Sequence, residues 1–76
     1  FSWSDEAREE PEEACEDRSG ETAYHNGSGA YPVAEDTVYT NSSCTSTAEA
    51  GAYKMASGNV VVVAEGGVVD LIFTEC

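Results

Sequence analysis

The stretch VVVVAEGGVVDLIF, residues Val60 to Phe73, decides the fold of this chain. It contains two runs of mostly β-branched residues, which favour extended backbone because their χ1 angles are restricted in a helix. Glu65-Gly66-Gly67 separates the runs and supplies glycines for a turn that needs positive φ. The stretch therefore predicts a buried β-hairpin, and no other part of the sequence could nucleate a fold as well.

Short extended segments precede this hairpin, and turn residues separate them. Their content of Tyr, Thr and Val predicts strands at Thr22–His25, Thr37–Thr40 and Gly51–Met55. Clusters of Asn, Gly and Ser predict the turns Asn26–Gly29, Asn41–Ser43 and Ser57–Asn59. Residues 21–76 are therefore expected to form an antiparallel β-meander of four to five strands.

Residues 1–20 form a separate, strongly acidic segment. Its apolar side chains recur at helical spacing, at Trp3, Ala7, Pro11, Ala14 and Cys15, and acids fill most of the opposite face. A proline inside a continuous helix would cost about 3 kcal/mol. The segment therefore predicts a helix that either kinks at Pro11 or restarts as a second short helix with Pro11 in its first turn.

The expected fold class is α+β, a short acidic helix at 1–20 packed on the β-meander at 21–76 within one small domain, residues 1–76. A core of this size needs a staple. Cys15 and Cys76 lie near the two ends, and a disulfide between them would contribute about 4 kcal/mol in the chain-entropy model and imply an oxidising compartment. Three cysteines allow three single bridges, and an odd one, such as Cys44, is available for a bridge between subunits.

The charge of the chain argues against two classes of partner. Fifteen acidic residues against three basic ones give a formal net charge of −12. Nucleic acids and anionic membrane surfaces both attract Lys and Arg. No apolar run approaches the roughly 18 residues of a membrane span. We therefore expect no nucleic-acid partner and no membrane insertion, which leaves a surface glycan, a protein, or copies of the chain itself.

No set of residues has the spacing of a catalytic or metal site. His25 is the single histidine, and nothing in the spacing places a nucleophile and a carboxylate beside it. The cysteines are isolated, whereas zinc sites usually show paired ligands. We therefore predict no catalytic residue, no metal and no cofactor. The candidate contact residues are instead Tyr24, His25, Asn26 and Tyr31, because loops and aromatic side chains on a rigid sheet commonly bind glycans and proteins.

The order of these features resembles a known kind of module. The matching segments are Glu13-Ala14-Cys15, Tyr24 to Pro32, Asp36 to Asn41, Ala50 to Lys54, Gly66 to Val69 and the closing Cys76. They are similar to small cysteine-bracketed β-modules near the C-termini of phage tail or fibre proteins and of bacterial cell-surface proteins. The resemblance implies attachment or structural display at a cell surface or virion, without catalytic residues. Cys44 and the acidity of the N-terminal segment depart from this pattern.

Three functions follow as hypotheses. The first is a non-enzymatic extracellular or virion-associated module for surface attachment or display, with contact loops around Asn26–Pro32 and Asn41–Glu49. The second is a structural subunit that polymerises into a fibre or pilus-like filament through its last strand. The third, a small secreted effector, rests on a similarity of the terminal hairpin to small fungal ribonucleases, although their His/Glu/Arg catalytic set is not found.

Overall fold

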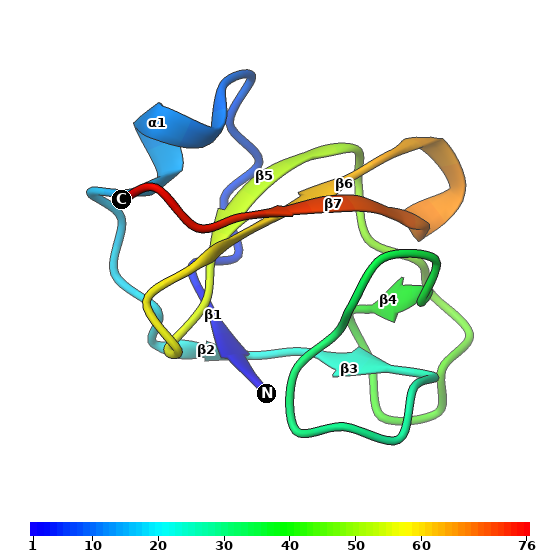
Figure 1. The fold of residues 1–76 in the computed structure, drawn as a ribbon. Helices are drawn as coiled ribbons and strands as arrows, with labels where there is room; N and C mark the ends of the chain where they lie inside the picture. Colours follow the sequence, from blue (N-terminus) through cyan, green and yellow to red (C-terminus); the bar gives the residue numbers. More distant parts are fainter.

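The computed structural model describes all residues, 1–76, and shows short strands with very little helix (Figure 1). The elements are β1 (Ser2–Trp3), α1 (Pro11–Ala14), β2 (Glu21–Thr22), β3 (Tyr24–His25), β4 (Val38–Tyr39), β5 (Gly51–Lys54), β6 (Val60–Val63), the 3-10 turn η1 (Glu65–Gly67) and β7 (Val69–Phe73). They form three sheets, β1–β2, β3–β4 and β5–β6–β7. The expected α+β class with one four- to five-stranded meander is therefore wrong, because the strands divide into three small antiparallel sheets beside a single helical turn.

The valine-rich hairpin is confirmed as β6 and β7. The two strands pair antiparallel, with Val60 opposite Phe73, and a register shift follows Val62. Gly66 and Gly67 adopt φ of 86° and 83°, the left-handed region that the sequence required of this turn. The connection is longer than a tight two-residue turn because η1 lies within it.

The three-stranded sheet packs against other parts of the chain on one face and is covered in part on the other. Residues directly opposite each other in neighbouring strands point to the same face. One face packs into the main core, which contains Trp3, Ala23, Val38, Ala48, Tyr53, Met55, Val61, Val63 and Val69. The other face brings Ala52 and Val60 against Ala14 of α1, with Val62 and Phe73 at the border. The short helix therefore covers part of the second face of the sheet.

The helix predicted within residues 1–20 is also wrong except at Pro11–Ala14, because most of this segment pairs with strands instead. Ser2 and Trp3 form β1 against β2. The chain then follows the outer edge of β5, where the Arg8 N–H donates to the Ala52 carbonyl at 3.1 Å and the Ala52 N–H returns a bond at 2.8 Å. These contacts satisfy backbone groups that a helix would have satisfied locally. Of the two alternatives at Pro11, the short helix with Pro11 in its first turn is the one that forms.

The first predicted strand, Thr22–His25, divides because its two halves have different partners. Glu21 and Thr22 pair with β1, whereas β3 pairs with β4. Ala23 lies between them, fully buried, and exchanges two backbone hydrogen bonds of 2.7 Å with Phe1. The change of partner at Ala23 separates the first two sheets.

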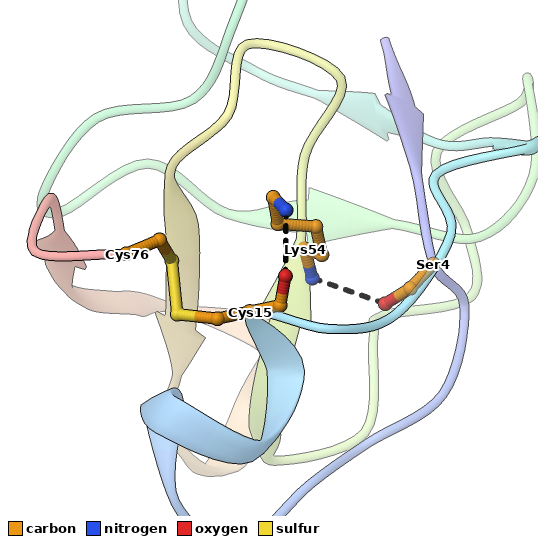
Figure 2. Close-up of a disulfide and its surroundings, with 4 residues drawn as sticks. All are labelled: Ser4, Cys15, Lys54 and Cys76. Atoms are coloured by element: carbon orange, nitrogen blue, oxygen red, sulfur yellow. Dashed lines mark hydrogen bonds between the residues drawn. A yellow bond between two sulfur atoms is a disulfide. The ribbon is translucent and has the colours of Figure 1, made fainter.

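The predicted disulfide joins Cys15 at the end of α1 to Cys76 beyond β7, with their Cα atoms 5.5 Å apart (Figure 2). The Nζ of Lys54 donates to the Cys15 carbonyl at 2.7 Å, so the same point is also tied to β5. The Lys54 N–H donates to Ser4 Oγ at 3.0 Å. The covalent bridge and these bonds hold both ends of the chain against the three-stranded sheet.

Neither helical segment has the length and apolarity needed to cross a bilayer.

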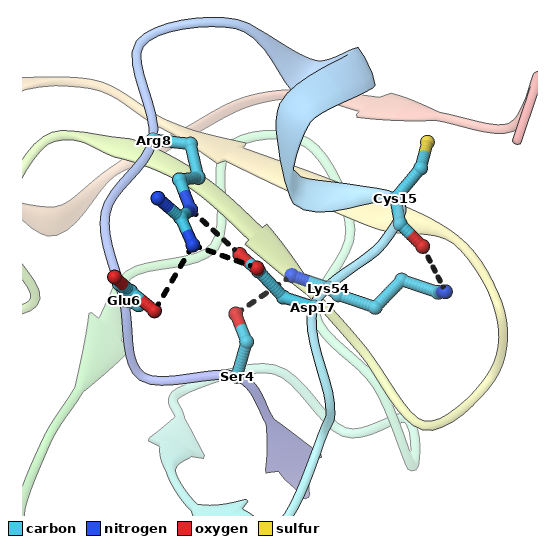
Figure 3. A network of polar contacts seen from close by, with 6 residues as sticks. All are labelled: Ser4, Glu6, Arg8, Cys15, Asp17 and Lys54. Carbon is cyan, nitrogen blue, oxygen red and sulfur yellow. Dashed lines mark hydrogen bonds and ion pairs between the residues drawn. The ribbon is translucent and has the colours of Figure 1, made fainter.

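A polar network fastens the acidic segment to itself (Figure 3). The Arg8 guanidinium donates two hydrogen bonds of 2.9 Å to the Asp17 carboxylate and lies 3.2 Å from Glu6. The hydrogen bonds from Arg8 hold the pKa of Asp17 below its ordinary value, and they raise the pKa of Arg8. Bidentate arginine–carboxylate pairs fix geometry as well as charge. The pair therefore anchors the loop that follows α1.

Asp17→Asn should lower the melting temperature by a few degrees at neutral pH, and the difference from the unmodified chain should vanish in acid. A lowered carboxyl pKa in the folded state stabilises the fold above the unfolded pKa of about 4, and this stabilisation is lost as pH falls through the folded pKa. Thermal melts between neutral pH and about pH 2 measure the effect. Glu12→Gln, at an exposed acid outside any ion pair, is the control. A difference that stays constant with pH would contradict the prediction.

Candidate contact surface

The sheet formed by β3 and β4 places two tyrosines side by side. Tyr24 lies opposite Tyr39, and His25 lies opposite Val38. Val38 is fully buried and the His25 side chain is 7% exposed, so that pair faces the core. Because side chains alternate between the faces of a strand, Tyr24 and Tyr39 lie together on the outer face, where both are half-buried. The outer face of this sheet therefore carries a pair of adjacent aromatic side chains.

The His25 side chain, at the end of β3, is enclosed beside the loop between β3 and β4. Its Nδ1 lies 3.2 Å from Asp36 Oδ2 and 3.2 Å from the Gly27 nitrogen. Nδ1 either accepts the Gly27 N–H or donates to Asp36, depending on the tautomer. The ring of Phe1 contacts His25 edge-on, with centroids 5.5 Å apart. The structure thus places this predicted contact residue in β3, where its side chain contacts Gly27 and Asp36 of the following loop.

The other predicted contact residues hold the same loop. Asn26 Oδ1 accepts the Thr37 N–H at 2.8 Å, and the Asn26 N–H donates to the Thr37 carbonyl at 3.1 Å. Tyr31 is half-buried and packs on Phe1 with ring centroids 6.1 Å apart. In the structure, His25, Asn26 and Tyr31 therefore stabilise the loop between β3 and β4. Of the four predicted contact residues, Tyr24 is the one on the outer face.

Gly27→Ala should destabilise the chain by about 1–3 kcal/mol. A Cβ atom on Gly27 would overlap the Asp36 carboxylate, which the loop holds in place through the Val33 N–H at 3.1 Å. Urea denaturation measures the change in the free energy of unfolding. Gly20→Ala is the matched control, because a Cβ there meets nothing within 4 Å. Equal stability of the two variants would show that the carboxylate moves aside freely.

A second loop, from Thr40 to Ser46, is built around the side chain of Asn41. Its Oδ1 accepts the N–H groups of Thr45 and Ser46 at 3.0 and 3.1 Å. Its Nδ2 donates to Ser43 Oγ at 3.0 Å and to Thr45 Oγ1 at 2.7 Å. The Thr40 N–H closes the loop by donating to the Ser46 carbonyl at 2.8 Å. One amide thus fixes a hydroxyl-rich loop that begins immediately after Tyr39.

Cys44 lies in this loop with a free, exposed thiol. Its φ of 57° is in the left-handed region, and its N–H donates to the Asn41 carbonyl at 3.1 Å. The loop therefore presents the thiol to solvent. The disulfide pairs the other two cysteines, Cys15 and Cys76, so Cys44 takes no part in it.

The sequence placed Asn41 at the start of a predicted contact loop, but it did not single out Tyr39 as a contact residue or Asn41 as the residue that fixes the loop. The alternation of Val38 and Tyr39 could have indicated that Tyr39 faces away from the core. An asparagine followed by several Ser and Thr residues is also a known turn-forming pattern, because its side chain bonds nearby backbone. The surface has no pocket and no group of three or more His, Cys, Asp or Glu that could hold a metal ion.

Comparisons with models of known protein families, with curated proteins and with solved structures found no match.

Proposed function

We propose that this chain is a non-enzymatic binding module of an extracellular, cell-surface or virion-associated protein, and that it attaches to a surface glycan or protein. The observation that carries the proposal is the pair Tyr24 and Tyr39 beside the loop that Asn41 fixes. Aromatic rings offer an apolar platform for the carbon face of a sugar ring, and Tyr hydroxyls add polar contacts. Neighbouring Ser and Thr hydroxyls can then bond the sugar's own hydroxyls.

The rigidity of the surface supports this function. A loop that is already ordered loses less conformational entropy when it binds. The Asn41 side chain makes four hydrogen bonds within its own loop. The Cys15–Cys76 disulfide staples the rest of the chain, and disulfides of this kind persist in oxidising surroundings such as the cell exterior. The proposed setting outside the cell is therefore consistent with the way the chain is stapled.

An array of immobilised glycans, probed with the oxidised chain, tests the proposal. We expect binding to a subset of glycans, and Tyr24→Ala and Tyr39→Ala should each lower the affinity by about tenfold or more. Leu71→Ala is the control, because Leu71 is an exposed apolar side chain on a different sheet. Asn41→Ala should weaken binding to the same glycans, because it removes the hydrogen bonds that order the loop. Binding that survives both tyrosine substitutions, or no binding to any glycan or surface protein tested, would reject the proposal.

The filament hypothesis remains a second proposal, favoured by the exposed edge of β7 and the free thiol of Cys44. The net charge of −12 opposes contact between copies at low salt. Light scattering at low and high salt, with and without reductant, tests it. An assembly that reductant dissociates would support bridges through Cys44, whereas a monomer of 8.0 kDa under all conditions would reject the filament.

The ribonuclease-like hypothesis gains no support from the geometry, since His25 is enclosed and Arg8 is bound to Asp17.

A further inference from the structure

We infer that the free edge of β7 is a docking surface for an extended, basic segment of a partner protein, which adds to the three-stranded sheet as a fourth strand. This site is separate from the outer face of the β3–β4 sheet, so the inference does not depend on the proposed attachment function. It rests on three features of the edge: its unpaired backbone, its exposed apolar side chain and its surrounding charge.

The two edges of the three-stranded sheet differ. The outer edge of β5 is already occupied, because Ser4 and Arg8 bond the backbone of Lys54 and Ala52. On β7, only the first residue is covered from outside, where Val69 exchanges hydrogen bonds with the backbone of residues 35 and 36 at 2.9 and 2.7 Å. From Asp70 to Phe73, β7 makes backbone hydrogen bonds to β6 alone.

The register identifies which backbone groups are free. Residues of an antiparallel strand alternate between facing their partner and facing away. The Ala64 N–H bonds the Val68 carbonyl, so Val62 also faces β7, and its opposite residue is Leu71. Ile72 is the next residue, and its N–H and C=O therefore point away from β6. A strand laid along this edge would bond both groups of Ile72, which is the usual basis of β-strand addition.

The side chains beside this edge favour an apolar residue in the partner. Leu71 is 45% exposed and lies on the face of the sheet that α1 covers only in part. Val62, directly opposite Leu71, is half-buried at the border of that covered area. An apolar side chain at alternate positions of the added strand would lie next to Leu71 and remove it from water.

The charge around the edge selects a basic partner over a second copy of the chain. Four exposed acids lie on β7 or border it: Glu35, Glu65, Asp70 and Glu75. No Lys or Arg follows Lys54 in the sequence, and the Lys54 ammonium is already bonded to the Cys15 carbonyl. A second copy would bring the same acids and a further charge of −12 to the contact. A segment that alternates basic and apolar residues matches both the charge and the exposed leucine.

The test uses the oxidised chain and a capped peptide of about eight residues that alternates lysine and valine. Amide hydrogen exchange by NMR should show a fast Ile72 amide in the free chain, beside slow amides of Leu71 and Phe73. Peptide binding should slow exchange at Ile72 by about tenfold or more. A peptide that alternates glutamate and valine should not bind. Leu71→Lys and Asp70→Lys, both at exposed positions, should each weaken binding of the basic peptide by about tenfold.

Ser28→Lys is the matched control, because it adds the same charge at an exposed residue of the loop between β3 and β4. It should leave peptide binding within about twofold. Equal weakening by Ser28→Lys, binding without protection of Ile72, or no binding of the basic peptide would each overturn the inference. Protection of Ile72 that rises with protein concentration in the absence of peptide would also overturn it, since the occupant would then be a second copy. Tyr24→Ala should not alter peptide binding, so this site and the proposed glycan surface can fail independently.

Discussion

Replacing both Cys15 and Cys76 by serine should lower the free energy of unfolding by about 4 kcal/mol and the melting temperature by about 20 °C. The bridge closes a loop across a sequence separation of 61, and in the chain-entropy model the stabilisation grows with loop length. The disulfide also keeps α1 in place. A helix of four residues has no stability of its own, so α1 depends on the packing of Ala14 against the sheet.

Urea and thermal denaturation in a Cys44→Ser background measure this effect, because that background prevents a substitute bridge through Cys44. Cys44→Ser alone is the reference and should melt with the unmodified chain, since the thiol is exposed and unpaired. The unmodified chain in reductant should match the double serine variant. If the double variant keeps its stability to within about 1 kcal/mol, the two ends are held mainly by the hydrogen bonds of Lys54 and Ser4.

The parts of the fold that were predicted correctly depend on neighbouring residues. The hairpin follows from valines that disfavour helix and from two glycines with positive φ, all within one short stretch. The start of α1 follows from the fixed φ of Pro11. The N-terminal strand could not be predicted this way, because Trp3 and Arg8 pair with residues far along the chain. The apolar residues of the acidic segment have helical spacing, but most of this segment forms hydrogen bonds to distant strands instead of a helix.

The contact surface was predicted in part for a similar reason. Tyr24 and the two loops could be placed from turn composition, and the structure keeps Tyr24 on an outer face. Which face His25 takes depends on the register of β3 with β4, and a loop of a dozen residues between them leaves that register open. The exposure of Leu71 also depends on a part of the chain that lies far away in the sequence. The hairpin pattern predicts burial for the whole run, yet α1 is too short to cover the far end of its face.

Trp3→Ala should destabilise the chain by about 3–5 kcal/mol, the second large effect that we expect. Trp3 is 1% exposed and stacks on Tyr53 with ring centroids 4.0 Å apart and an interplanar angle of 19°. Burial raises the pKa of Tyr53 to about 12. The Tyr53 hydroxyl donates to the Glu49 carbonyl at 2.6 Å, and this bond holds the ring that stacks on Trp3. Removing the indole would leave a cavity that these neighbours cannot fill.

Trp3→Phe should cost much less, on the order of 1 kcal/mol. The Nε1–H of Trp3 is buried without a hydrogen-bond partner, and an unpaired buried donor costs about 1–3 kcal/mol. Phenylalanine removes that donor and keeps an aromatic ring against Tyr53, which offsets much of the lost volume. Urea denaturation of both variants gives the comparison. Equal losses would mean that the Nε1–H has a partner in solution, such as a bound water.

Ala7→Ser separates the strand from the helix that the sequence suggested for this segment. In that helix Ala7 would share a buried face with Trp3, and a serine there would cost about 1 kcal/mol or more. In the structure Ala7 is exposed at the outer edge of β5, so the substitution should change stability by less than about 0.5 kcal/mol. A large loss of stability from Trp3→Ala together with no loss from Ala7→Ser is expected when β1 buries Trp3 and leaves Ala7 exposed. Comparable losses at both positions would contradict this arrangement and support the helix instead.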